Sequence, residues 1–128
     1  MKFILNCFVF SCTLLLACTV SAQTKLNPDA FEKMLTELSG KVQLIDVRTP
    51  EEFVLDRLEG AQNYNFRDSD FKDRLKALDK TKPVLVYCAA GGRSIKTTEL
   101  LVKFGFKDIY ELEGGIHAWI EKEKPLAK

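Results

Sequence analysis

The 128-residue sequence predicts an α/β domain built around a mainly parallel sheet. Short apolar runs typical of strands alternate with stretches that have the spacing of amphipathic helices. Glycine, proline or a capping residue stands at most of the transitions between them. Such alternation is typical of a layered structure in which helices connect parallel strands.

The first half of the domain contains two predicted helices and two predicted strands. Asn27 followed by proline indicates a helix start, and apolar residues spaced i, i+3, i+4 and i+7 extend this helix towards Gly40. A short strand is predicted over 42–47. A Thr-Pro-Glu-Glu sequence then begins a brief helix over 50–55, and a second strand is predicted over 61–66.

The second half continues the same alternation. A helix is predicted from the Asp68-Ser69 cap to Leu78, with its apolar residues on one face. The remaining predicted elements are a buried strand over 84–87, a helix over 94–104, a strand over 108–112 and a last helix carrying Ile116, Trp119 and Ile120.

Residues 1–22 have the organisation of a secretory signal peptide. Lys2 forms a minimal positive region, an apolar stretch follows, and small residues up to Ala22 offer a cleavage site. We therefore expect an exported, periplasmic protein. Two alternatives stay open: an uncleaved membrane anchor, and a lipoprotein, because Leu-Leu-Ala-Cys ending at Cys18 resembles a bacterial lipoprotein box.

The charge and the cysteine content limit the classes of function that this sequence allows. Cleavage of the signal peptide would remove Lys2 and leave 18 basic residues against 18 acidic ones. The mature chain would then have no excess of basic residues to attract nucleic acid. Three of the four cysteines lie in the signal segment, and Cys88 alone remains. It has no partner for a disulfide or a Cys-X-X-Cys pair, and His117 is the sole histidine, so we expect no metal. A lone thiol in an exported domain indicates reactivity.

The surroundings of Cys88 favour a nucleophile. The residue follows the strand over 84–87 and precedes a glycine-containing loop and a helix start. Amides at a helix start attract anions, and cysteines in such settings ionise readily. In parallel sheets the site lies beyond the carboxyl ends of the strands, where Cys88 is placed.

Several segments together resemble the rhodanese (thiosulfate sulfurtransferase) domain. The resemblance supports a rhodanese-like domain over 26–124, with a mainly parallel central sheet flanked by helices on both faces. One departure is visible, since residues 56–59 read Asp-Arg-Leu-Glu where the family commonly has Gly-His-Ile-Pro. The matching segments are Asp46 to Phe53, Gly60-Ala61 with Asn63, Tyr87-Cys88 with Gly91, Arg93 and Ser94, Gly105 to Leu112, Gly114-Gly115 and Trp119.

This resemblance implies that Cys88 is catalytic. It would take a sulfane sulfur from a small sulfur-containing anion such as thiosulfate, form a persulfide and pass the outer sulfur to cyanide or a thiol. No cofactor is implied, and a redox protein is a further candidate partner. The residues expected to bind substrate are Ala89, Ala90, Gly91, Gly92, Arg93 and Ser94, and those expected to support the loop are Asp46, Arg48 and Glu51.

Two other functions remain as alternatives. The domain could carry sulfur or bind a partner protein with little turnover. It could also act as a cysteine-loop phosphatase or arsenate reductase, although such loops tend to place five residues between the cysteine and the arginine. Here four residues separate Cys88 from Arg93.

Overall fold

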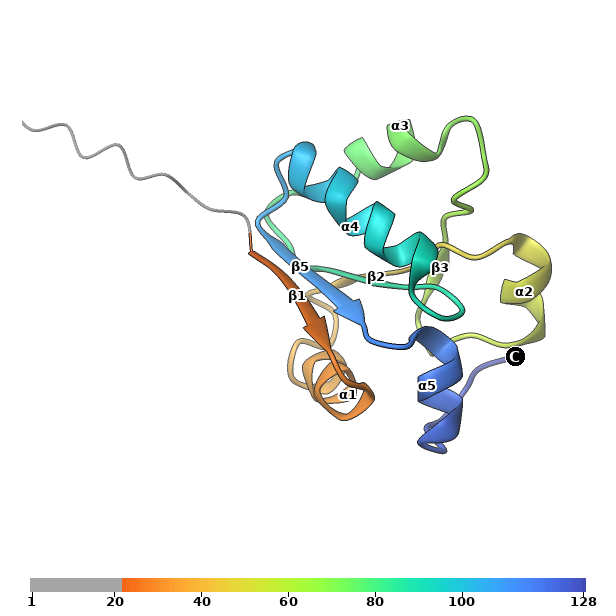
Figure 1. Cartoon of the computed structure of the whole chain (residues 1–128). Coiled ribbons are helices and arrows are strands. Elements are labelled where there is room, and N and C mark those ends of the chain that lie inside the picture. Colours follow the sequence, from red (N-terminus) through yellow and green to blue (C-terminus); the bar gives the residue numbers. More distant parts are fainter. Residues whose placement is uncertain (1–21) are drawn as a thin grey trace, which may run out of the picture.

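The computed structural model describes residues 22–128, which form a five-stranded parallel sheet. The strand order is β1-β5-β4-β2-β3, so β4 lies at the centre (Figure 1). All neighbouring strands pair in parallel, which confirms the predicted fold class. The strands are β1 (Ala22–Leu26), β2 (Gln43–Asp46), β3 (Gln62–Asn63), β4 (Val84–Tyr87) and β5 (Asp108–Leu112).

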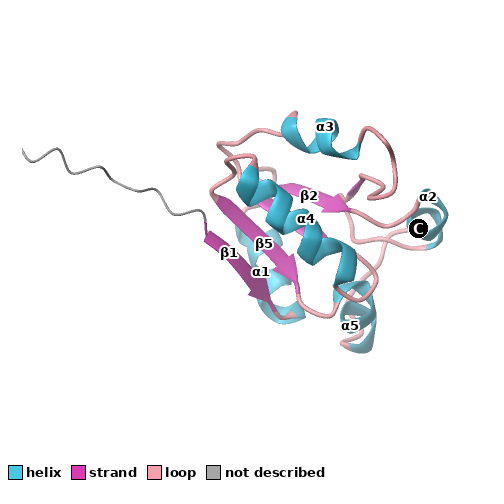
Figure 2. Cartoon of the chain, turned by 45° about the horizontal axis from the view of Figure 1, so that its top comes forward, coloured by secondary structure: helices cyan, strands magenta, loops and turns pink. Residues whose placement is uncertain are grey.

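Helices cover both faces of the sheet, as predicted. Figures 1 and 2 show α3 and α4 on one face, and α1 and α5 on the other, with α2 beyond the carboxyl ends of the strands. Two clusters of buried apolar side chains fill the two interfaces. The helices are α1 (Pro28–Glu37), α2 (Pro50–Leu55), α3 (Phe71–Lys76), α4 (Gly92–Lys103) and α5 (Gly115–Glu121).

The alternation of side chains along the central strand, β4, determines the face of the sheet on which the Cys88 sulfur lies. Side chains alternate along a strand, and in β4 Val84 and Val86 pack into the cluster beneath α3 and α4. Leu85 and Tyr87 pack into the opposite cluster with α1 and α5. Cys88 continues the first set, so its sulfur lies on the α4 side of the sheet.

Two predicted helix starts have the expected capping bonds. The Asn27 side chain accepts a hydrogen bond of 2.8 Å from the Ala30 amide. At α2, the Thr49 hydroxyl accepts from the Glu52 amide and the Glu52 carboxylate accepts from the Thr49 amide, a reciprocal capping box. The capping box fixes Glu52 near the cysteine loop, where it has a second role described below.

Four elements differ clearly from the prediction. β1 was not predicted, because its polar, partly exposed residues show no apolar alternation at this edge of the sheet. β3 is limited to two residues, although the backbone continues to hydrogen-bond to β2 through Tyr64 and Phe66. α3 begins at Phe71 without a side-chain cap. α4 begins two residues early, which places Arg93 in its first turn.

The predicted signal peptide over 1–22, its cleavage site and Cys18 lie almost entirely outside the described residues, which begin at Ala22. Within 22–128, no helix has the length and apolar character needed to cross a membrane.

Candidate active site

Cys88 lies at the carboxyl end of β4, within a tight loop that leads into α4. Its sulfur accepts a hydrogen bond of 3.0 Å from the Gly91 amide and lies 3.4 Å from the Ser94 hydroxyl oxygen. Gly91 has a φ of +123°, a conformation that favours glycine. Cys88, Gly91 and Ser94 are buried, Ala89 and Arg93 are half-buried, and Ala90 and Gly92 are exposed. Of the predicted loop residues, Ala90, Gly91 and Ser94 therefore provide the groups that contact the sulfur.

The loop favours the ionised form of this thiol. Burial, with Cys88 only 1% exposed, opposes ionisation and is the largest single influence on the pKa of Cys88. Hydrogen bonds from the Ser94 side chain and from the Ser94, Gly91 and Ala90 amides together outweigh it and lower that pKa. The thiolate is the nucleophilic form of cysteine, so the arrangement activates Cys88.

The first turn of α5 holds the loop from behind. The Ile116 amide donates to the Cys88 carbonyl at 2.9 Å, and the His117 amide donates to the Ala89 carbonyl at 3.1 Å. Gly115 allows this approach, because a Cβ atom there would lie 2.4 Å from the Ala89 carbonyl oxygen. With these carbonyls bound to α5, the loop turns amide groups rather than carbonyls towards the sulfur. The His117 side chain is exposed.

Arg93 forms an ion pair that the sequence did not predict. Its two terminal nitrogens donate to the two carboxylate oxygens of Glu52 at 2.8 and 3.1 Å. This fork uses two of the five N–H donors of the guanidinium. The bonds from Arg93 lower the pKa of Glu52 to about 2, with further help from Thr49. Arg93 thus joins the first turn of α4 to α2 at the rim of the cysteine loop.

Asp46 and Arg48 form a buried pair at the end of β2. Asp46 is fully buried and Arg48 is 4% exposed, and their closest contact is 2.8 Å. Arg48 also donates to the carbonyl and carboxylate of Asp56, at 2.6 and 3.2 Å. The prediction that Glu51 belongs to this frame was wrong, since Glu51 is exposed and Asp56 takes that place. Within residues 22–128 the pair holds the backbone around α2 and has no hydrogen bond to the sulfur.

Comparison with known proteins identifies the family. The sequence model of the rhodanese-like domain matches residues 27–122, most of the chain. The chain belongs to the rhodanese-like domain family. It is 40% identical over 84 residues to the uncharacterized protein YqhL of Bacillus subtilis, a match that covers 66% of this chain and 65% of YqhL. Over 77 residues it is 35% identical to the thiosulfate sulfurtransferase GlpE of Pseudomonas fluorescens, covering 59% of this chain and 68% of GlpE.

A solved structure shows the same fold. The rhodanese-related protein of Thermoplasma volcanium superposes with a TM-score of 0.69 at 30% sequence identity. The superposition covers 81% of this chain and 97% of that protein. The fold and family expected from the motifs are therefore confirmed.

The segment that departs from the usual rhodanese sequence is well anchored. Leu58 is fully buried, and its amide donates to the Tyr87 hydroxyl at 3.1 Å. Burial raises the pKa of Tyr87, with Asp46 adding to the effect, so this hydroxyl stays neutral. Leu58 of the Asp-Arg-Leu-Glu sequence therefore connects this segment to Tyr87, the last residue of the strand that precedes Cys88.

Three residues near the loop were missed by sequence reasoning: Glu52, Glu111 and Gly115. Glu52 and Gly115 lie in segments that resemble the family, but they contact the loop across the fold, so the sequence did not indicate these contacts. Glu111 did leave a signal, because it lies two residues after the apolar Ile109 in β5, and residues two apart on a strand face the same side. Its carboxylate lies 2.9 Å from the Ser94 hydroxyl oxygen.

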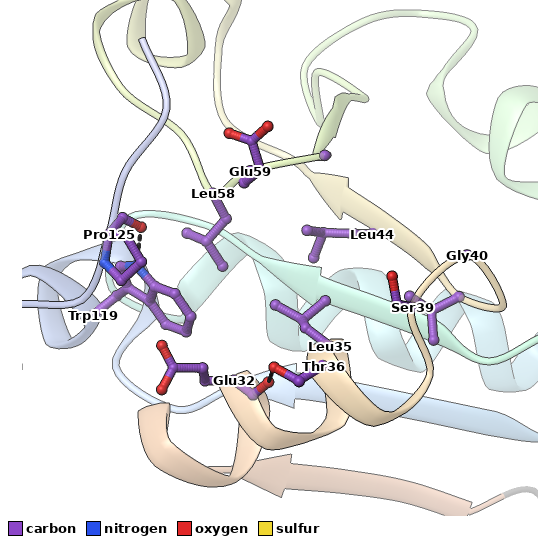
Figure 3. A pocket seen from close by; sticks show the side chains of 12 residues that line it. Glu32, Leu35, Thr36, Ser39, Gly40, Leu44, Leu58, Glu59, Trp119 and Pro125 are labelled. Carbon is purple, nitrogen blue, oxygen red and sulfur yellow. Dashed lines mark hydrogen bonds between the residues drawn. The ribbon is translucent and has the colours of Figure 1, made fainter.

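A pocket of about 510 Å³ lies away from this loop (Figure 3). It is lined by Leu35 of α1, Leu44 of β2, Leu58 and Trp119, which belong to or border the core on the α1 and α5 face. The sheet therefore separates it from Cys88. Among the residues that the structure describes, no three histidine, cysteine or acidic side chains gather in a group suited to a metal ion.

Proposed function

We propose that this rhodanese-like protein is a sulfurtransferase that carries a sulfane sulfur on Cys88. The observation that carries the proposal is the position of the sulfur, 3.0 Å from the Gly91 amide and beside Ser94 at the end of β4. The relationship to GlpE, a thiosulfate sulfurtransferase, supports the same chemistry.

The first step is attack of the Cys88 thiolate on the outer sulfur of thiosulfate. A bond forms between the two sulfurs, and the bond from the outer sulfur to the sulfonate group breaks. Sulfite leaves with the electron pair, and Cys88 is left as a persulfide anion. The amides that favour the thiolate also favour this anion, because fixed dipoles around the loop act wherever the charge resides.

The second step returns the thiolate. Cyanide attacks the outer sulfur of the persulfide, the sulfur–sulfur bond breaks, and thiocyanate leaves while Cys88 regains its electron pair. A thiol acceptor would react in the same way once ionised. Since no external base is needed for either anion, the exposed His117 has no assigned role.

Arg93 is the group that would meet an anionic donor. Its guanidinium lies near enough to Cys88 for the charge on the sulfur to add to the rise in the pKa of Arg93. Glu52 holds two of its donors, so a donor anion either displaces Glu52 or uses the remaining N–H groups. Cys88 as a whole is 1% exposed, so a donor reaches its sulfur only when neighbouring groups move.

Mixing the purified domain with thiosulfate and cyanide tests the proposal. We expect thiocyanate production and, with donor alone, a mass increase of one sulfur atom on Cys88. Cys88→Ser should abolish both. Loading of one sulfur with negligible turnover on cyanide or small thiols would instead identify a carrier that serves a partner protein. Absence of both loading and turnover would contradict the proposal.

We also propose that the protein is exported, on the basis of the signal-like residues 1–22. Cleavage after Ala22 would release a periplasmic domain. Mass spectrometry of the mature protein from its native host tests this directly: a start at Gln23 agrees with it, and a diacylglycerol adduct on Cys18 would show a lipoprotein instead.

A further inference from the structure

Glu111 is a buried acid that the proposed mechanism leaves without a role. It is 1% exposed, within β5, and Val86 of the central strand lies opposite it. Its Oε1 atom lies 2.9 Å from the Ser94 hydroxyl oxygen, while Oε2 has no hydrogen-bond partner among the residues that the structure describes. A buried carboxylate with an unpaired oxygen is costly, whereas a neutral acid in the same place costs far less.

Gly91 brings the loop over this acid. A Cβ atom at Gly91 would lie 3.6 Å from Oε1 of Glu111, in ordinary van der Waals contact. The loop that holds Cys88 therefore rests on the carboxyl group, and Ser94 lies between them. Sulfur, hydroxyl and carboxyl form a continuous chain, with steps of 3.4 and 2.9 Å.

Ser94 has a single proton to donate. Its oxygen lies near the Cys88 sulfur, the Gly91 carbonyl and the Glu111 carboxyl, but it has one proton to donate. The Gly91 carbonyl can only accept, whereas the thiol and the protonated carboxyl can also donate to Ser94. If Glu111 is ionised, it competes for this proton, and Cys88 is best placed as a thiol that donates to Ser94. If Glu111 is neutral, it donates to Ser94, whose proton is then available to a thiolate.

We infer that Glu111 and Cys88 share one exchangeable proton through the Ser94 hydroxyl, and that this proton lies on Glu111 when the sulfur carries the negative charge. The thiol proton passes to the Ser94 oxygen while the proton of Ser94 passes to Oε1 of Glu111. The products are a thiolate and a neutral carboxylic acid, so the number of protons and the total charge are unchanged. One negative charge moves from the acid to the sulfur, and the hydrogen bonds along the chain reverse. Glu111 is thus a positioning residue for the proposed sulfur transfer, because it acts through Ser94.

The charges around Glu111 are few. Lys25 of β1 lies opposite it in the parallel register, and Glu113 lies in the turn that directly follows β5; both are exposed. β4 contributes Cys88, and α4 contributes Ser94. Burial raises the pKa of Glu111, which Ser94 and Lys25 oppose and Glu113 reinforces. The pKa of Cys88 is lowered, so the two groups shift in the directions that favour the exchange.

Titration of Glu111 by NMR, with carbon-13 in the glutamate carboxyl groups, tests the inference without requiring turnover. Glu111→Gln identifies the signal by its disappearance. We expect Glu111 to remain protonated in the wild type while Cys88 is already ionised. In Cys88→Ser the neighbouring charge is absent, and the ionisation constant of Glu111 should increase at least tenfold. In Ser94→Ala this difference should shrink, because the connecting hydroxyl is lost.

The thiolate absorbance of Cys88 gives the reciprocal measurement. Glutamine is neutral and can donate to Ser94, so the pKa of Cys88 in Glu111→Gln should stay within about 0.3 of the wild-type value, a twofold change in ionisation constant. Glu113→Gln is the matched control, since it removes an exposed carboxylate two residues from Glu111, in the turn after β5. A tenfold stronger ionisation of Cys88 in Glu111→Gln would show that Glu111 is normally ionised and would overturn the inference. Identical titration of Glu111 with and without Cys88 would overturn it as well.

These titrations separate this inference from the proposed function. Failure of thiocyanate formation would contradict sulfur transfer and leave the shared proton intact. Independent titration of Glu111 and Cys88, in a protein that still transfers sulfur, would remove only the role of Glu111.

Discussion

Gly115→Ala tests the close packing of α5 against the cysteine loop. Gly115 has a φ of +61°, and an added Cβ atom would lie 2.4 Å from the Ala89 carbonyl oxygen and 2.6 Å from that of Cys88. Both oxygens belong to the backbone, so they cannot swing aside like the end of a long side chain. The helix or the loop has to move, and the bonds from Ile116 and His117 to these carbonyls weaken.

The expected cost combines three effects. An alanine with positive φ costs about 1–2 kcal/mol, and forcing a methyl group into a filled space costs roughly 1–3 kcal/mol. Two weakened hydrogen bonds add on the order of 1 kcal/mol. We therefore expect a loss of about 3–6 kcal/mol, a large share of the roughly 5–15 kcal/mol that stabilises a domain of this kind.

Urea unfolding followed by circular dichroism measures this loss. Gly40→Ala is the matched control, because Gly40 also has a positive φ of +75° but nothing lies within 4 Å of an added Cβ atom. It should cost only the backbone strain, about 1–2 kcal/mol. Gly115→Ala should also raise the pKa of Cys88, measured by thiolate absorbance, and Gly40→Ala should leave it unchanged. Equal destabilisation by the two variants, with no change at Cys88, would refute the reasoning.

Three further substitutions probe the frame around the loop. Glu52→Gln should lower stability by about 1 kcal/mol at neutral pH, since the ion pair with Arg93 is partly exposed. Because folding lowers the pKa of Glu52 from 4.5 to about 2, this stabilisation is fully present above 4.5 and is lost as the pH falls towards 2. The free energies of urea unfolding of the wild type and of Glu52→Gln should differ at pH 4.5 and converge as the pH approaches 2. If this difference in free energy did not depend on pH, the ion pair would be excluded as its source. Arg48→Met should cost about 3–5 kcal/mol by leaving the charge of Asp46 buried and unpaired; thermal unfolding checks this, and a near-wild-type melting temperature would contradict it. Tyr87→Phe should cost about 1–3 kcal/mol, because the buried Leu58 amide loses its partner. Its Cys88 alkylation rate should match the wild type, since Tyr87 faces the other side of the sheet, and a slower rate would show coupling between the two faces.

Local signals predicted most of the fold. The order of apolar runs and helix caps was enough for four strands and five helices, since each signal involves residues near one another in sequence, such as Asn27 and Ala30. β1 was not predicted, because an edge strand with exposed residues needs no apolar alternation. Its identity depends on pairing with β5, far along the chain.

The candidate site also has one part that could be predicted from the sequence and one part that could not. The loop from Cys88 to Ser94 is continuous in sequence, so its residues and their role around the sulfur could be predicted together. The partners of that loop could not, because Glu52 reaches Arg93 from α2. Glu111 reaches Ser94 from β5, and only a three-dimensional arrangement shows that these groups meet.

The strand order also governs when the domain can assemble. β1 borders β5 alone, so the first strand to leave the ribosome finds its neighbour only after Leu112 has been synthesised. Until then one side of β4 is likewise open, because β5 is its second neighbour. Contacts between such distant segments form slowly, since a long loop must close first. A nascent chain that stops before Asp108 therefore carries the nucleophilic loop on an unfinished sheet.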